Sequence, residues 1–274
     1  MKTRPCAKIN LGLNIVSKRE DGYHNLETVF FPVPIYDEIE IVEVPEKESS
    51  ASRCTLTISG LPIEGDPEKN LVVRAYRLLE KRTPLPPVHI NLIKNIPMQA
   101  GMGGGSADGA YTLTLLNEMF HLNIPTRELE EMAATLGADC AFFIQSQPAY
   151  AEGIGEVLSP IELSLNNYTL AVVKPPVAVS TREAFAYIKC RKPAKCCRDI
   201  VQQPIETWRD ELVNDFEESI FPQFPAIAGI KRKLYDLGAV YASMSGSGSA
   251  VFALFADEPE GLQSHFPDCF TAVL

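Results

Sequence analysis

The chain of 274 residues lacks three features that mark common classes of site. It has no Gly-Lys dipeptide, which excludes the Walker phosphate loop because that motif contains Gly-Lys before its final Ser or Thr. It has no Cys-x-x-Cys pair, and its four histidines are scattered, so nothing in the sequence supports a zinc site. The seven cysteines are odd in number, and we expect free thiols in a reducing compartment.

Long apolar runs and an excess of basic residues are also absent. No apolar run reaches the length of a membrane span, and the N-terminal residues lack the apolar core of a signal peptide. The net charge of −10 leaves no broad basic surface for nucleic acid. We therefore expect a cytoplasmic protein whose partners are small molecules, without a nucleic acid or a membrane. The oligomeric state does not follow from the sequence.

The most informative segment that is present is rich in glycine. Gly101, Gly103, Gly104 and Gly105 directly precede an apolar run, Ala107–Met119, that is typical of a helix. Backbone N–H groups at a helix start bind phosphate oxygens, and glycine lets a ligand approach closely. A Rossmann fingerprint would need glycine where Ser106 stands, and a flexible linker is rare between a strand and an apolar helix. The segment predicts a phosphate-binding loop of a third type.

The periodicity of the remaining sequence mixes strands and helices without regular β-α-β spacing, which indicates an α+β fold. We predict a domain boundary near a turn-rich segment, with domains at residues 1–155 and 156–274. An exposed hairpin tip is expected at Pro45–Arg53. The predicted strands are 7–16, 26–32, 38–44, 54–59, 88–93 and 168–173, with a strand pair around 243–250; the predicted helices are 70–81, 107–119, 126–136, 182–188, 206–216 and 227–237, and 145–160 is predicted as turns.

Two residues form a candidate acid–base pair. Asp139 follows a helix that Thr126 is predicted to cap, and it leads into an apolar run. Lys8 lies among apolar neighbours in a predicted strand. Taken singly, Asp139 could cap a following helix and Lys8 could extend its amine to water from a strand edge. Together they suit phosphoryl transfer, in which a carboxylate accepts a hydroxyl proton and an ammonium stabilises the transferred phosphate.

Two turns complete the set of motifs. Asp21-Gly-Tyr-His24 ends in an aromatic ring and an imidazole, which suit a planar base, although a loop histidine is more often solvated or structural. Ser245-Gly-Ser-Gly248 taken alone indicates a plain hairpin between two strands.

In this order the motifs resemble the GHMP kinase superfamily. The similarity rests on Ala7–Leu11, Arg19–His24, Asn70–Ala75, Pro97–Ser106, Leu136–Asp139, Ala151–Glu156 and Gly246–Gly248. It implies an N-terminal domain like ribosomal protein S5 domain 2 and a C-terminal α/β domain. It also implies a small-molecule kinase that uses ATP with Mg²⁺, whose metal ligands stay unassigned. Within the superfamily the motifs are similar to those of the branch that phosphorylates a cytidine diphosphate alcohol, the 2-hydroxyl of 4-diphosphocytidyl-2-C-methyl-D-erythritol, in isoprenoid precursor synthesis.

The resemblance also implies a role for each candidate residue. Asp139 would be the base and Lys8 its electrostatic partner. The ATP site would comprise Asn70, Leu71, Lys94, Pro97, Met98, Gln99, Ala100, Gly101, Met102, Gly103, Gly104, Gly105, Ser106 and Ala107. The substrate site would comprise Asn10, Tyr23, His24, Thr181 and Phe185, with His24 contacting the cytosine edge and Tyr23 stacking on the base.

Two positions depart from the superfamily pattern. Cys140-Ala141 replaces Val-Pro after the predicted base, and Ala107 stands where a second serine is usual. Two alternatives stay open: another small-molecule kinase of the superfamily, and a nucleotide-binding protein without turnover. The Tyr23-His24 pair argues against the first, and the Lys8 and Asp139 pair argues against the second.

Overall fold

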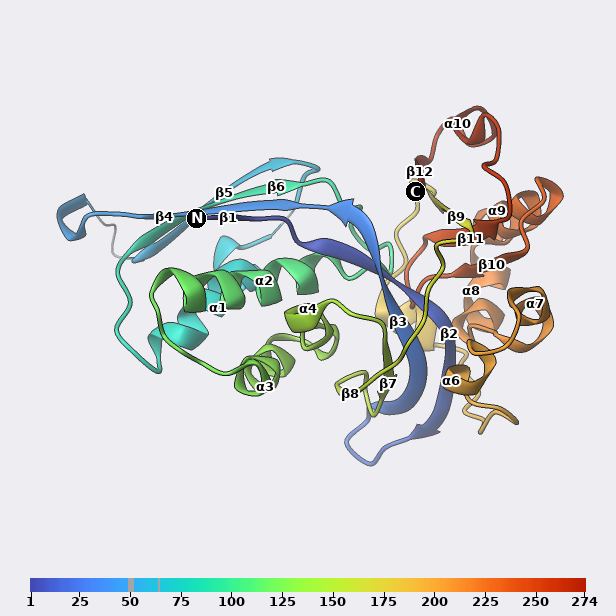
Figure 1. The fold of residues 1–274 in the computed structure, drawn as a ribbon, viewed down its shortest axis with the longest axis horizontal. Helices are drawn as coiled ribbons and strands as arrows, with labels where there is room; N and C mark the ends of the chain where they lie inside the picture. The colour runs from blue at the N-terminus through green and yellow to red at the C-terminus, as the bar shows by residue number, and fades with distance from the viewer. Residues whose placement is uncertain (49–51, 64) are drawn as a thin grey trace. The chain divides into compact units, whose positions relative to one another are not determined.

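The computed structural model describes residues 1–48, 52–63 and 65–274 (Figure 1). The chain forms two compact units, each built from separate stretches of sequence. Unit 1 comprises Met1–Ala7, Val33–Met98 and Gly103–Gln147, and unit 2 comprises Lys8–Pro32, Gln99–Met102 and Pro148–Leu274. The predicted domain boundary between residues 155 and 156 stays a prediction.

Unit 1 contains a four-stranded sheet in the order β1-β4-β6-β5. Its strands are β1 (Lys2–Thr3), β4 (Glu38–Glu43), β6 (Val88–Lys94) and β5 (Cys54–Gly60). Strand β4 is antiparallel to β6, and β5 is parallel to it. The predicted hairpin with its tip at Pro45–Arg53 is therefore wrong, because β4 and β5 flank β6 and do not pair with each other. Residues 49–51 of that tip lie outside the described residues.

The helices of unit 1 lie on one side of this sheet (Figure 1). They are α1 (Leu71–Glu80), α2 (Gly104–Met119), α3 (Thr126–Leu136) and α4 (Phe142–Gln145). Alternation along β6 buries Val88, Ile90, Leu92 and Lys94, and α1 packs against α2. Thr126 is not the N-cap of α3 as predicted; that position belongs to Pro125, and Thr126 is the first helical residue.

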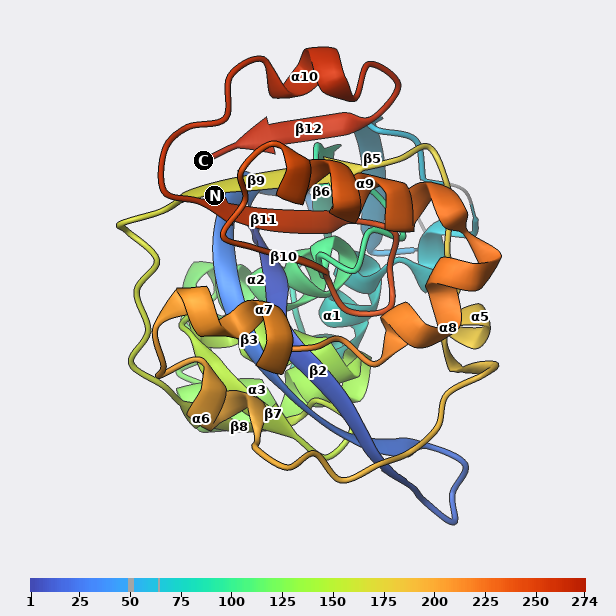
Figure 2. The ribbon, with the colours of Figure 1, turned by 90° about the vertical axis from the view of Figure 1, so that its right-hand side faces the viewer.

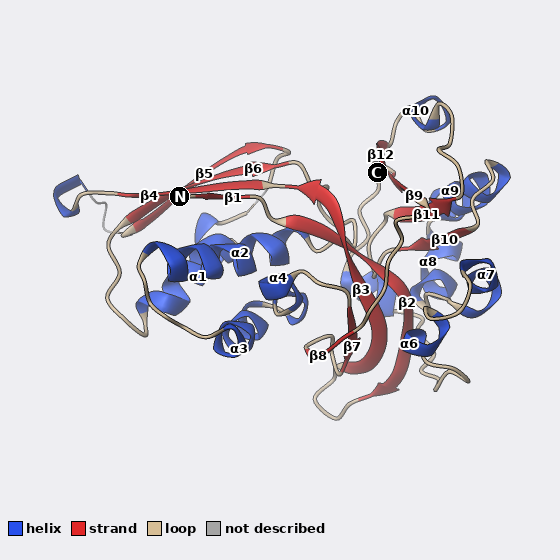
Figure 3. Ribbon diagram, in the orientation of Figure 1, coloured by secondary structure: helices blue, strands red, loops and turns tan. Residues whose placement is uncertain are grey.

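Unit 2 contains two further sheets, coloured red in Figure 3. One has the order β2-β3-β7-β8, with β2 (Cys6–Lys18), β3 (His24–Tyr36), β7 (Ala149–Glu152) and β8 (Val157–Pro160). The first two residues of β2 and the last four of β3 belong to unit 1. The other has the order β10-β11-β9-β12, with β10 (Tyr241–Met244), β11 (Val251–Phe255), β9 (Thr169–Lys174) and β12 (Phe270–Val273). Residues 145–160, predicted as turns, thus contain the antiparallel pair β7–β8.

The helices of unit 2 are short except for two that pack together. They are α5 (Thr181–Phe185), α6 (Cys197–Ile200), α7 (Trp208–Glu211), α8 (Phe216–Gln223), α9 (Pro225–Asp236) and α10 (Leu262–His265). Helix α9 packs against β10 and β11 (Figure 2), where Ile227, Ile230 and Leu234 join the core of the unit.

The predicted helix at residues 206–216 is interrupted between α7 and α8. Leu13 N–H donates to Val213 O at 2.8 Å, and Asp215 N–H donates to Leu13 O at 2.8 Å. This segment thus hydrogen-bonds to strand β2, which is incompatible with helical pairing. Within the described residues, no helix has both the length and the apolarity needed to span a bilayer.

Candidate active site

The first half of the glycine-rich loop packs against the late glycine turn inside unit 2. Gly101 has φ +76°, and a Cβ there would lie 1.8 Å from Ser245 O. Ser245 Oγ donates to Gly101 O at 2.9 Å, and Ser249 N–H donates to Gln99 O at 3.1 Å. The Ser245–Gly248 turn connects two paired strands as predicted, but it also fixes the loop Gln99–Met102, which the sequence did not indicate. Glycine is required at Gly101 by both conformation and space.

Lys8 is held against the same loop. Its side chain is buried in β2, its Nζ donates to Gly101 O at 2.9 Å and to Asn10 Oδ1 at 2.5 Å, and it lies 5.0 Å from the centre of the Phe30 ring. Asn10 Nδ2 in turn donates to Thr28 Oγ1 at 3.0 Å. The expectation that Lys8 extends to water from a strand edge is wrong. Asn10 orients Lys8, and the predicted contact of Asn10 with cytidine stays a prediction.

The second half of the loop begins α2 inside unit 1. The helix starts at Gly104, three residues before the predicted Ala107, with Gly103 (φ 69°) at its N-cap. No side chain in the described part of the chain caps this end, and its first turn has no acidic residue. The first N–H groups of α2 are therefore suited to an anion. Ala107 and Met102 are buried, and Met98, next to Pro97, is exposed.

Lys94, at the end of β6, is surrounded by acidic partners. Its side chain is fully buried, and its Nζ donates to Asp108 Oδ2 at 2.7 Å and to Asp37 Oδ2. A buried ammonium needs such partners, because the cost of desolvating it is large. The Lys94 side chain is thus committed to two carboxylates, and its predicted place beside adenosine stays a prediction.

Asn70 and Leu71 occupy the start of α1. Asn70 Oδ1 accepts from Val72 N–H at 3.1 Å, so Asn70 is the N-cap of the helix. A Cβ added at Gly109 of α2 would lie 3.0 Å from Leu71 Cβ, so Leu71 packs directly on the glycine of that helix. The contact between Leu71 and Gly109 places the start of α1 against α2. The predicted contacts of Asn70 and Leu71 with ATP stay predictions.

Asp139 lies in unit 1, in the 3₁₀ turn Ala138–Cys140 that follows α3. It is half-buried, and neither this turn nor α4 has a side-chain cap, so Asp139 does not cap a helix. Burial raises the pKa of the neighbouring Cys140 thiol to about 11, with a hydrogen bond to Ser106 acting against that shift and the Asp139 carboxylate adding to it. Ala107 in the loop and Cys140 next to the predicted base both depart from the superfamily pattern, and both are buried.

The predicted substrate residues of unit 2 come from two segments. Tyr23 is exposed in the β2–β3 turn, where its N–H donates to Asp21 Oδ1 at 3.0 Å. The His24 ring stacks on Phe185 of α5, with 4.7 Å between ring centres and 23° between planes. Burial and the cation of Lys18 lower the pKa of His24, which favours the neutral imidazole. Thr181 begins α5, whose N-cap Ser180 forms a capping box with Glu183.

Sequence reasoning missed Asp37 and Asp108, which hold Lys94 in place, and it named Ser245 only as part of a hairpin turn, without its contact to Gly101. A charged residue within the apolar α2 run was a detectable signal for Asp108. Asp37 and Ser245 carry no such signal, because their partners are distant in sequence. No group of three or more His, Cys, Asp or Glu side chains that could hold a metal occurs among the described residues.

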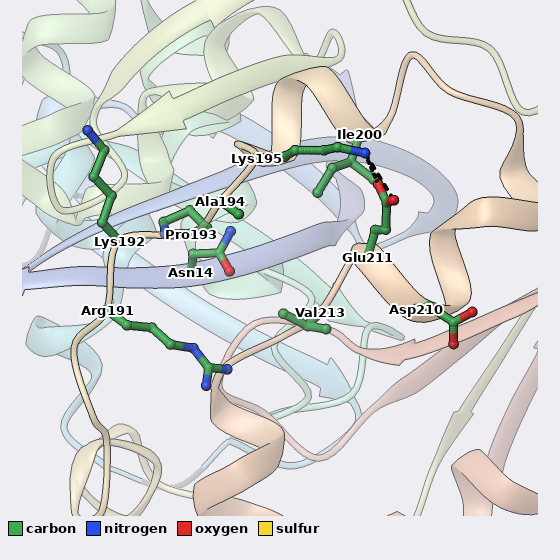
Figure 4. Close-up of a pocket in the computed structure, with 10 residues that line it drawn as sticks. All are labelled: Asn14, Arg191, Lys192, Pro193, Ala194, Lys195, Ile200, Asp210, Glu211 and Val213. Carbon is green, nitrogen blue, oxygen red and sulfur yellow. Dashed lines mark hydrogen bonds and ion pairs between the residues drawn. The ribbon is translucent and has the colours of Figure 1, made fainter.

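A cavity of about 420 Å³ in unit 2 is lined by none of the predicted site residues of that unit (Figure 4). It is lined by the basic segment Arg191–Lys195 together with Asn14, Ile200, Asp210, Glu211 and Val213. Lys195 pairs with Glu211 at 2.7 Å, and Arg191 pairs with Asp215 at 3.0 Å and Glu218 at 2.8 Å. These pairs compensate the charge of Lys195 and Arg191, so the cavity is not a strong anion site.

Two family models match the chain. The model described as the GHMP kinases N terminal domain matches residues 70–147, and the GHMP kinases C terminal model matches residues 198–269. The first match contains the glycine-rich loop and Asp139. Fold and site together define a GHMP kinase, a small-molecule kinase with mixed helices and strands.

Full-length relatives narrow this class. A Bacteroides fragilis protein named 4-diphosphocytidyl-2-C-methyl-D-erythritol kinase is 54% identical over 270 residues. The alignment covers 98% of this chain and 97% of the relative's chain. A Bacteroides thetaiotaomicron protein of the same name is 55% identical over 261 residues, covering 95% and 93%. The chain belongs to the family of the 4-diphosphocytidyl-2-C-methyl-D-erythritol kinases.

Solved structures agree with this assignment. A crystal structure of 4-(cytidine 5'-diphospho)-2C-methyl-D-erythritol kinase has a TM-score of 0.81 at 30% identity, covering 100% of this chain and 98% of its own. The Methanococcus jannaschii mevalonate kinase has a TM-score of 0.69 at 14% identity, covering 100% and 97%, which shows a shared fold alone.

Proposed function

We propose that the protein transfers the γ-phosphate of ATP to the 2-hydroxyl of 4-diphosphocytidyl-2-C-methyl-D-erythritol, giving the 2-phosphate and ADP. The full-length identity to kinases named for this substrate supports the proposal. The single structural observation that carries it is the buried ammonium of Lys8, held at 2.9 Å from the carbonyl of Gly101 in the glycine-rich loop.

The reaction follows from the chemistry of two residues. Asp139 accepts the proton of the 2-hydroxyl, and the oxygen that remains attacks the γ-phosphorus. The bond between the γ-phosphorus and the β–γ bridging oxygen breaks at the same time, and ADP leaves. Lys8 stabilises the negative charge that develops on the alkoxide and the transferred phosphoryl group. Lys8 is suited to this role because Asn10 and Gly101 fix its position before any ligand binds.

ATP binds with its phosphates at the loop Pro97–Ala107, where the uncapped start of α2 supplies N–H donors. Mg²⁺ enters as part of the ATP substrate, because Mg²⁺ is commonly held by phosphates with few protein ligands. Asn70, Leu71 and Lys94 are assigned to the adenosine end by resemblance to the superfamily.

The cytidyl end of the substrate binds to the turn before β3 and to α5. A neutral imidazole at His24 offers one donor and one acceptor to the cytosine edge. Tyr23 and Phe185 supply aromatic faces, and Thr181 contacts the diphosphate. The ring of His24 already lies on Phe185, so the two segments are in contact at the proposed base site.

Replacement of the base tests the assignment. Asp139→Asn removes the proton acceptor but keeps the shape of the side chain, so kcat should fall about 1,000-fold, within the range for general bases. The Kd for ATP, measured by calorimetry, should change less than about twofold because Asp139 acts on the alcohol. Asp257→Asn, an exposed aspartate of unit 2, is the matched control and should leave kcat unchanged. Retention of most of the activity in Asp139→Asn would show that another group is the base.

A further inference from the structure

Three buried charged side chains of unit 1 form a chain of ionic contacts. Lys94, Asp37 and Asp108 have side chains that are 0%, 0% and 3% exposed. Lys94 Nζ donates to Asp108 Oδ2 at 2.7 Å and also to Asp37 Oδ2. We call these three residues the buried triad.

The buried triad joins the two ends of the glycine-rich loop. On the entering side, Asp37 Oδ1 accepts from Asn95 N–H at 2.6 Å and from Ile96 N–H at 2.8 Å. On the leaving side, Asp108 lies one turn after Gly104, the first residue of α2. The two sides are close, because a Cβ at Gly104 would lie 2.9 Å from Ile96 Cγ2 and 3.3 Å from Lys94 Nζ.

The charges of the buried triad are not balanced when both carboxyl groups are ionised. Asp108 Oδ1 has no hydrogen-bond partner among the residues that the structure describes. Burial raises the pKa of Asp108 to about 7; the Lys94 ammonium opposes this shift, and the Asp37 carboxylate adds to it. The helices α1 and α3, which pack against α2, bury no charged residues.

Stability alone is a poor reason for such an arrangement. Replacing buried ionic groups with well-packed apolar groups is often neutral or stabilising, whereas ionic contacts fix geometry through directed hydrogen bonds. The contacts of the buried triad fix one geometry in particular, the position of the first turn of α2 relative to Lys94–Ile96. That turn carries the N–H groups that are suited to phosphate.

We propose that Asp108 is a positioning residue for ATP: through Lys94 it holds the first turn of α2 in register with the segment Lys94–Ile96 that enters the loop. Asp108 does not touch the nucleotide. The inference rests on the proposed function only in taking ATP as the ligand of the loop. A loop whose ends are fixed loses less conformational freedom when it closes on the phosphates, which favours binding.

Three variants test this role. Asp108→Leu removes the hydrogen bond to Lys94, and Asp108→Asn keeps an oxygen that can accept it. Leu79→Ala, at a fully buried position of α1, removes apolar packing from the same unit and leaves all three triad residues in place. The ATP Kd should rise about tenfold in Asp108→Leu, at the lower end for a lost charge-assisted hydrogen bond. It should return to within about threefold of the parent value in Asp108→Asn and stay unchanged in Leu79→Ala. The KM for the cytidyl alcohol should change less than about twofold in all three.

The outcomes separate positioning from simple stabilisation. The proposal would be overturned if Asp108→Leu and Leu79→Ala lost the same thermal stability and had the same Kd for ATP. It would also be overturned if Asp108→Asn failed to restore ATP binding. If Asp108→Leu does not fold, Asp108→Ser, which is too short to reach Lys94, takes its place. A parent protein that binds ATP without phosphorylating the cytidyl alcohol would contradict the proposed function alone, and the Kd comparison would still decide the role of Asp108.

Discussion

Lys8 and Lys94 are both buried lysines, but their ammonium groups have different surroundings. Lys94 donates to two carboxylates within unit 1, which fix the position of its ammonium group. Lys8 donates to Asn10 and to the carbonyl of Gly101 in the loop, which suits a cation that acts on phosphate. The residue type alone therefore does not predict the surroundings of a buried lysine, because acceptors such as Gly101 O and Asp37 Oδ2 come from segments distant in sequence.

At the same scale, His24 should control affinity for the cytidyl substrate. His24→Ala removes the donor and acceptor proposed for the cytosine edge, so the KM for the cytidyl alcohol should rise about tenfold or more while the KM for ATP changes less than about twofold. Steady-state kinetics with each substrate varied in turn measures both. His265→Ala, an exposed histidine in α10, is the control and should change neither constant. Equal effects of His24→Ala on the two KM values would count against contact with cytosine.

The pH dependence of this contact has a definite sign. Burial and Lys18 lower the pKa of His24, so the neutral ring is favoured at pH 7 and the ring gains its proton at a lower pH than an ordinary histidine does. The cation has no acceptor nitrogen, so the KM for the cytidyl alcohol should rise on acidification. This rise should be absent in His24→Ala; its persistence there would assign the titration to another group.

At the scale of elements, the glycine-rich segment contains glycines with two different requirements. Gly101 is enclosed, since a Cβ would overlap Ser245 O, and its φ is positive. Gly105, in the first turn of α2, has nothing within 4 Å of a Cβ. The first glycine is needed by the fold itself, and the second is open to a ligand.

This difference predicts opposite results for two alanine variants. Gly101→Ala should lower the free energy of unfolding by about 2 kcal/mol or more, because strain and overlap add. Gly105→Ala should keep or raise that free energy, because alanine favours a helix, yet it should weaken ATP binding by crowding the phosphates. Denaturant unfolding and calorimetry with ATP measure the two quantities. Gly229→Ala, in an open helical position of α9, is the control and should lower neither the free energy of unfolding nor the affinity for ATP. Unchanged ATP affinity in Gly105→Ala would place the phosphates elsewhere.

At the scale of the whole molecule, the fold does not decide the substrate. A mevalonate kinase shares the fold with a TM-score of 0.69 at 14% identity. Specificity must therefore lie in side chains, and the Tyr23-His24 turn with Phe185 is the part of this chain that suits a base.

Substrate selectivity follows from this conclusion. With ATP present, ADP release should be fast with 4-diphosphocytidyl-2-C-methyl-D-erythritol and at least about 100-fold slower with mevalonate, homoserine or galactose, which lack a base for these rings. A coupled assay for ADP at equal substrate concentrations measures the ratio, and a reaction without any alcohol gives the background. Comparable rates with one of the other alcohols would assign the chain a different substrate.

Local patterns in the amino-acid sequence predicted a helix directly after the glycine-rich loop, most of the strands and helices, and the mixed α+β architecture, and the structure confirms these. These depend on local properties, namely glycine at a helix start and apolar periodicity along Ala107–Met119. Element limits were less accurate where local signals are ambiguous: α2 begins earlier than its first apolar residue, and the helix expected at 206–216 is broken by backbone pairing with Leu13.

Which groups meet depends on the tertiary fold. It joined Ser245 to Gly101, separated by 144 residues, and Asp37 to Lys94, separated by 57. The structure also showed that Asp139 is not a helix cap and that the amine of Lys8 is buried and does not extend to water. Such contacts depend on chain segments that are distant in sequence, and no local pattern encodes the partner of a buried charge. The physical reason is that desolvation makes each buried charge require a partner, while the fold alone determines which residue supplies it.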